Sequence, residues 1–182
     1  MSETEERYAQ VAGGFDARVQ AAPAGRWAAE APCEGWKARD VVSHVVDNHR
    51  RLISAINGGE NIPMGPQDDP KQAWSEVFGK MKTLTGDSKA MEAVVDGPVG
   101  PMPLGQVLDN FVSMDILIHT WDLARAVGGD EGLDPESVQR VHEAMTPMDS
   151  MIRQPGIFGP KLEPPAGADA QTSLLYFLGR RA

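Results

Sequence analysis

Apolar residues recur every three or four positions along most of this chain, a spacing typical of helices that bury one face. Near the start, Tyr8, Val11, Phe15 and Val19 form such a stripe. Runs that alternate apolar and polar residues, as strands do, are few. The pattern therefore predicts a chain organised as helices.

Glycines, prolines and capping acids divide the chain into long helices. We expect them over 2–21, 38–57, from Asp69 to about Gly86, over 104–127, and from Pro135 towards Met151. A short helix within 170–181, a hairpin around Gly97 and Pro98, and an irregular segment over 154–170 complete the prediction. The natural assembly is an all-α, up-and-down four-helix bundle with additional short helices, in one domain spanning 1–182.

The composition narrows the class of protein. Hydrophobic residues make up 41% and charged residues 24%, which is normal for a folded, water-soluble chain and unlike a membrane span. The formal net charge of -9 would repel a phosphate backbone, so we expect no nucleic-acid partner. The first residues show no targeting pattern, and one cysteine, Cys33, allows no internal disulfide. We therefore expect a cytoplasmic protein.

The helix expected over 104–127 carries Asp115, His119 and Asp122 on its apolar face. An unpartnered buried carboxylate costs several kcal/mol, so each acid needs a cation, a donor or water. Asp115 and His119, four residues apart, could share a metal ion or form a hydrogen-bonded pair in the core. Asp122 could orient His119, but a pair with Arg125 at the rim of the bundle is the favoured interpretation.

A third metal ligand could come from the helix over 38–57, which holds His44 and His49. Periodicity mildly favours His49 as the inward residue, yet a ligand can also point along a seam between helices, so both stay open. His142 has charged neighbours and is interpreted as a surface residue. Cys33 could lie near the site, but a small buried hydrophobe is the favoured interpretation.

Two motifs together resemble a known family. "PCEGWKARDVVSHVV" followed by "DILIHTWDLARAVGG" is similar to actinobacterial proteins related to the N-terminal domain of mycothiol-dependent maleylpyruvate isomerase, within the DinB-like metalloenzymes. The resemblance implies a DinB-like bundle that binds one divalent metal, zinc or nickel, through His44, Asp115 and His119. Asp115 stands where the isomerase-like pattern has a glutamate. The isomerase's C-terminal domain is not expected here, so its reaction is not transferred.

The resemblance also implies a chemistry. A low-molecular-weight thiol such as mycothiol would be the cosubstrate, activated as a thiolate by the metal and transferred to a small electrophile. Arg50, Arg51 and Arg125 are candidates for binding a ligand carboxylate and equally for solvated surface residues. Two hypotheses compete with this thiol S-transferase or isomerase-like enzyme: a non-catalytic metal-binding or partner-binding module, and a metal-free structural protein. A homodimer is left open.

Overall fold

The computed structural model describes residues 2–153 and 158–182. The chain divides into two compact units, the first ending at Glu131 and the second beginning at Gly132. The single domain expected over 1–182 stays a prediction beside this division.

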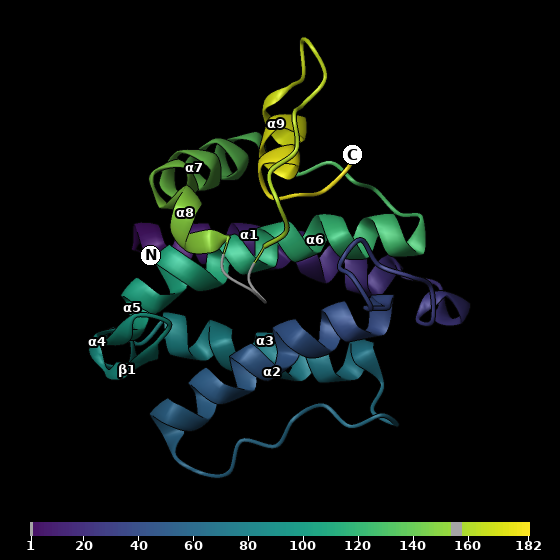
Figure 1. The fold of residues 1–182 in the computed structure, drawn as a ribbon. Helices are drawn as coiled ribbons and strands as arrows, with labels where there is room; N and C mark the ends of the chain where they lie inside the picture. Colours follow the sequence, from purple (N-terminus) through teal and green to yellow (C-terminus); the bar gives the residue numbers. More distant parts are fainter. Residues whose placement is uncertain (1, 154–157) are drawn as a thin grey trace. The chain divides into compact units, whose positions relative to one another are not determined.

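Four long helices form the core of the first unit (Figure 1). They are α1 (Glu3–Ala21), α2 (Ala38–Asn57), α3 (Pro70–Thr85) and α6 (Ser113–Val127). Helix α1 packs against α6 and α3, and α2 packs against the same two helices. The all-α four-helix bundle is thus confirmed, with α1 and α2, which are consecutive in the chain, at opposite corners.

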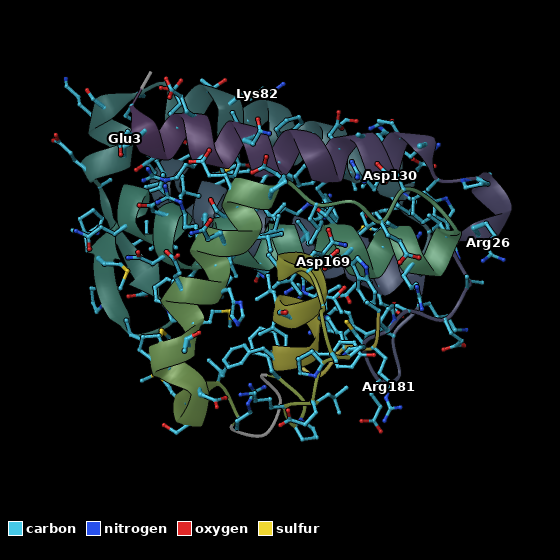
Figure 2. All side chains as sticks on the ribbon, turned by 90° about the horizontal axis from the view of Figure 1, so that it is seen from above. Glu3, Arg26, Lys82, Asp130, Asp169 and Arg181 are labelled. Carbon is cyan, nitrogen blue, oxygen red and sulfur yellow. The ribbon has the colours of Figure 1, made fainter. Side chains whose placement is uncertain are left out.

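Side-chain caps explain where the helices begin. Ser2 and Asp69 accept hydrogen bonds from the backbone amides of the first turns of α1 and α3. At α2 the capping position holds Lys37, whose backbone amide donates to Asp40 at 2.8 Å. Asp40 therefore stabilises the start of the helix that carries His44. Charged side chains such as Glu3, Lys82 and Asp130 are exposed (Figure 2).

The helix expected over 104–127 is present but contains a wider turn. It consists of α5 (Leu104–Val107), the π-helical segment η2 (Leu108–Val112) and α6. A π turn takes up one residue more than an α turn. A helical wheel drawn with the same rotation for every residue therefore assigns residues beyond the π turn to the wrong face. On an ideal α-helical wheel Phe111 shares a face with Leu108, yet Leu108 is buried and Phe111 is only half-buried. Arg7 of α1 anchors η2 by donating two hydrogen bonds of 2.7 Å to Asp109.

Smaller elements complete the first unit. They are η1 (Ala24–Arg26), α4 (Ser88–Glu92), and β1 (Val94–Gly97) paired antiparallel with β2 (Gly100–Pro103). The expected hairpin around Gly97 and Pro98 is thereby confirmed.

The second unit contains α7 (Pro135–Met145), η3 (Thr146–Met148), α8 (Asp149–Ile152) and α9 (Ala170–Phe177). The single helix expected from Pro135 towards Met151 is interrupted at η3, where Pro147 has no backbone N–H to donate to a preceding turn. Of the expected irregular segment, residues 154–157 lie outside the described residues, and 158–169 contain no helix or strand. None of the helices in the described part of the chain has the length and apolar character needed to cross a membrane.

His49 is buried in the bundle core, as the periodicity of α2 indicates. Its Nδ1 lies 2.6 Å from the carbonyl of Val45, and its Nε2 lies 3.0 Å from the hydroxyl of Tyr8. Because the carbonyl can only accept, Nδ1 carries the proton and Nε2 accepts from Tyr8. Burial lowers the pKa of His49 to about 4, so the ring is neutral at pH 7.

We expect His49 to make the stability of the protein depend on pH. In the unfolded chain a histidine titrates near pH 6.5, so between about pH 6.5 and 4 only the unfolded state binds this proton. The free energy of unfolding therefore falls as pH falls through this window and is unaffected by His49 above it. In urea unfolding, the stability advantage of wild type over His49→Gln should shrink by about 1 kcal/mol from pH 7 to 5.5. Parallel pH dependences for the two proteins would contradict this assignment.

Candidate metal centre

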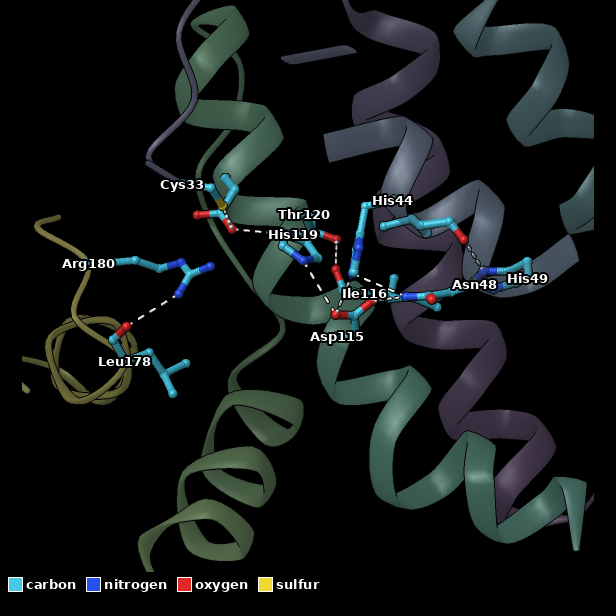
Figure 3. Close-up of polar contacts among 12 residues, drawn as sticks. Cys33, His44, Asn48, His49, Asp115, Ile116, His119, Thr120, Leu178 and Arg180 are labelled. Carbon is cyan, nitrogen blue, oxygen red and sulfur yellow. Dashed lines mark hydrogen bonds and ion pairs between the residues drawn. The ribbon is translucent and has the colours of Figure 1, made fainter. Parts of the chain in front are cut away.

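Three side chains from two helices converge on one point beside the bundle core (Figure 3). The Oδ1 atom of Asp115 on α6 lies 3.1 Å from Nε2 of His44 on α2 and 3.4 Å from Nε2 of His119. Donors about 2.0 Å from a tetrahedral ion stand about 3.3 Å apart. These two separations therefore fit a divalent ion, and two imidazoles with a carboxylate are a donor set that zinc accepts.

The charges of Asp115 and His119 depend on each other. Burial alone would raise the pKa of Asp115, but the attraction of His119 and the hydrogen bonds with His119 and His44 outweigh it, and the pKa lies below its usual range. Burial would likewise lower the pKa of His119, yet the charge of Asp115 and hydrogen bonds with Asp115 and Asp122 raise it well above 6.5. The raised pKa favours the protonated form of the His119 ring beside the two carboxylates, and a bound ion would take the place of the proton on Nε2.

Asp122 does not lie at the rim, so the favoured sequence interpretation is wrong. Its side chain is fully buried, and its Oδ2 lies 2.9 Å from Nδ1 of His119. Arg125 instead donates to Glu131 at 2.9 Å. By accepting from Nδ1, Asp122 leaves Nε2 of His119 to face Asp115, as carboxylates behind metal-binding histidines do. The i,i+3 spacing from His119 was the sequence signal for this role.

Cys33 also belongs to this cluster rather than to the apolar core. Its side chain is half-buried, and its thiol donates to Oδ2 of Asp122 at 3.3 Å. Cys33, His119 and Asp122 form a second group of donor atoms within 4.8 Å of one another. The thiol thus lies behind His119, on the side away from the proposed ligand nitrogen.

Two further side chains border the cluster, and the sequence pattern predicted a place at the site for neither. Trp36 stacks on the ring of His119, with centroids 5.7 Å apart and planes 21° apart, and lies 5.1 Å from the ring of His44. Nδ2 of Asn48 lies 3.1 Å from Nε2 of His44 and 3.4 Å from Oδ2 of Asp115. Asn48 follows His44 by four residues on α2, and this spacing was its sequence signal.

The remaining candidates lie elsewhere. His49 contacts Tyr8 and Val45, so the histidine favoured by periodicity is inward but is not in the cluster. His142, expected at the surface, is half-buried, with its ring 5.5 Å from that of Phe177.

Of the arginines, Arg50 donates to the carbonyl of Ile62, Arg51 is exposed, and Arg125 packs over the ring of Trp121 besides its pair with Glu131.

The part of the chain that carries the cluster is similar to known proteins. The model of the family described as the mycothiol maleylpyruvate isomerase N-terminal domain matches residues 8–124, which include every member of the cluster. Uncharacterized proteins of Mycobacterium tuberculosis strains CDC 1551 / Oshkosh and ATCC 25618 / H37Rv are each 31% identical over 153 residues, or 82% of this chain and 82% of the relative.

Solved structures show the same fold. The crystal structure of mycothiol-dependent maleylpyruvate isomerase superposes with a TM-score of 0.57 at 18% identity, covering 84% of this chain and 70% of that one. A histidine-to-alanine mutant of that enzyme gives a TM-score of 0.56 at 16% identity with the same coverage.

The buried position of Asp122 leads to a stability prediction. Asp122→Asn should lower the free energy of unfolding by about 3 kcal/mol, because it removes the buried charge that pairs with His119. Glu131→Gln, which breaks the more exposed pair with Arg125, should cost less than about 1 kcal/mol. Urea unfolding of both variants at pH 7 measures the difference. An equal loss of unfolding free energy in Asp122→Asn and Glu131→Gln would instead favour a rim position for Asp122.

Proposed function

Because the chain belongs to the mycothiol maleylpyruvate isomerase N-terminal domain family, we propose that it is a metal-dependent thiol S-transferase or isomerase-like enzyme. The observation that carries the proposal is the convergence of three potential ligand atoms. Oδ1 of Asp115 lies 3.1 Å from Nε2 of His44 and 3.4 Å from Nε2 of His119. His44 on α2 and Asp115 on α6 are 71 residues apart in the chain. A core hydrogen bond needs two groups, whereas this cluster brings together three groups that suit a metal.

His44, Asp115 and His119 would hold one divalent ion, zinc in first place and nickel in second. Two neutral imidazoles and one carboxylate leave a divalent ion with one net positive charge. A bound ion would favour the thiolate form of a neighbouring thiol, which is the nucleophilic form, and would balance its charge. The thiol that the isomerases' names indicate is mycothiol, and the partner substrate would be a small electrophile.

The protein's own side chains prepare this reaction. Asp122 accepts from Nδ1 of His119 and keeps Nε2 directed at Asp115. Trp36 stacks on the ring of His119 and lies at a tilt beside the ring of His44, so it would limit the access of water from that side. The amide of Asn48 reaches Oδ2 of Asp115, so it can orient the carboxylate with Oδ1 towards the ion. In the reaction the thiol proton would leave to solvent and the sulfur lone pair would form a bond to an electrophilic carbon. The electron pair of the bond broken at that carbon would depart with the leaving group, or, in an addition across a double bond, would move to the neighbouring atom, which takes a proton from solvent.

A cytoplasmic location is part of the same proposal, since thiols of low molecular weight are kept reduced in that compartment. The two competing hypotheses, a metal-binding module without catalysis and a metal-free structural protein, are outcomes of the following experiments.

Metal analysis tests the ligand set. Protein purified without chelators or a nickel column should carry about one equivalent of divalent metal, and His44→Ala less than about a tenth, because one of three ligands is lost. His142→Ala is the matched control and should keep the wild-type content. Wild type with less than about a tenth of an equivalent, together with unchanged stability in His44→Ala, would leave the metal-free structural protein as the better account.

Thiol transfer tests catalysis. Conjugation of mycothiol to a generic electrophile should slow about 100-fold or more in Asp115→Ala, because the metal ion that stabilises the thiolate would lose one of its three ligands. Asp115→Glu, which restores the acid of the isomerase-like pattern, should retain much of the rate. Asp130→Ala removes an exposed acid paired with Arg18 and should leave the conjugation rate unchanged. Equal rates for wild type and Asp115→Ala would favour the non-catalytic binding module.

A further inference from the structure

A tight turn precedes α2 and carries two of the side chains that border the cluster. The backbone amide of Trp36 donates to the carbonyl of Cys33 at 3.0 Å, and Gly35 between them has a φ of 75°. Just outside the turn, the amide of Ala31 donates to the carbonyl of Trp36 at 2.8 Å. A left-handed φ suits glycine and strains other residues. The backbone of this turn, 33–36, is therefore held in one conformation.

The two ends of the turn contact His119 in different ways. Trp36 stacks on the face of the imidazole, which limits the tilt of the ring. Cys33 donates to the same oxygen of Asp122 that faces Nδ1 of His119, which holds the carboxylate behind the ring. Rotation about the bond to an imidazole has a broad energy profile, so the ring needs outside contacts to keep one orientation. The turn supplies one contact to its face and one, through Asp122, to its edge.

We propose that the turn 33–36 is a positioning device that fixes the ring of His119 so that Nε2 meets the metal, with Cys33 and Trp36 as its positioning residues. The inference rests on the proposed function and deepens it. It gives Cys33 a role as a hydrogen-bond donor behind the ligand. Groups behind a metal ligand typically change metal affinity 10- to 100-fold when they are removed.

Two glycine substitutions separate positioning from general stability. Gly35→Ala strains the turn, and a methyl group there meets no atom within 4 Å. Gly58→Ala is the matched control: its φ of 73° is equally left-handed and its surroundings equally open, but it lies at the far end of α2 from His44. Titration of the metal-free proteins with Co²⁺, followed by its visible absorption, should show affinity about tenfold weaker or worse in Gly35→Ala. Gly58→Ala should stay within twofold of wild type.

Cysteine substitutions test the edge contact without altering the backbone. Cys33→Val removes the donor at similar volume and should weaken Co²⁺ binding about tenfold. Cys33→Ser keeps a donor and should remain within threefold of wild type, a rescue that a mere packing role would not give. Wild-type affinity in both Gly35→Ala and Cys33→Val would overturn the proposal while leaving the metal site intact.

A second readout requires no metal. Stacking on Trp36 shifts the NMR signals of the His119 ring protons upfield, and Gly35→Ala should lose this shift whereas Gly58→Ala keeps it. If wild type binds no Co²⁺ but shows this pattern, the proposed function fails and the positioning role stands. If the ring protons are unshifted in wild type, the turn does not hold His119 and the inference is wrong.

Discussion

An ionised carboxylate inside a helical bundle must have a partner, and the candidate site follows from this constraint. Helix α6 is apolar enough to be buried on almost every side, yet it carries Asp115 and Asp122. Both acids lie against His119, one at each ring nitrogen. The imidazole of His119 therefore links Asp122, which is fully buried, to Asp115, which is half-buried and faces α2. The half-buried side is where a ligand can arrive.

Sequence periodicity predicted where most of the helices lie. It did not predict which residues face inward on both sides of the π turn in η2. Caps at Asp69 and Asp134 and the stops after Asn57 and Val127 mark helix ends through local chemistry, so they can be recognised without a fold. The π turn in η2 cannot, because no residue in Leu108–Val112 requires it. Its anchor, Arg7, lies about a hundred residues earlier in the chain. Packing between distant segments decides the register of that helix.

The candidate site likewise has features that local spacing predicts and features that only packing between distant segments decides. Asp115 and His119 could be paired from their spacing, and the motif resemblance pointed to His44 where periodicity leaned to His49. The two histidines of α2 lie in different surroundings. His49 is neutral in the core and contacts Tyr8, whereas His44 lies at the seam between α2 and α6. The role of Asp122 behind His119 was named from the sequence but ranked second, because a helix wheel cannot rank two partners on one face. Burial decided between His119 and Arg125.

The wider turn of η2 has a consequence for how the segment tolerates change in length. Each residue removed or added within Leu108–Val112 would rotate α6 relative to α5 by about 100°. Asp115 would then leave the seam with α2 even if every side chain of the cluster were kept. Substitutions in η2 alter packing locally, whereas insertions and deletions act on the whole donor set. The number of residues between the hairpin and Asp115 is thus as much a part of the site as the identity of its ligands.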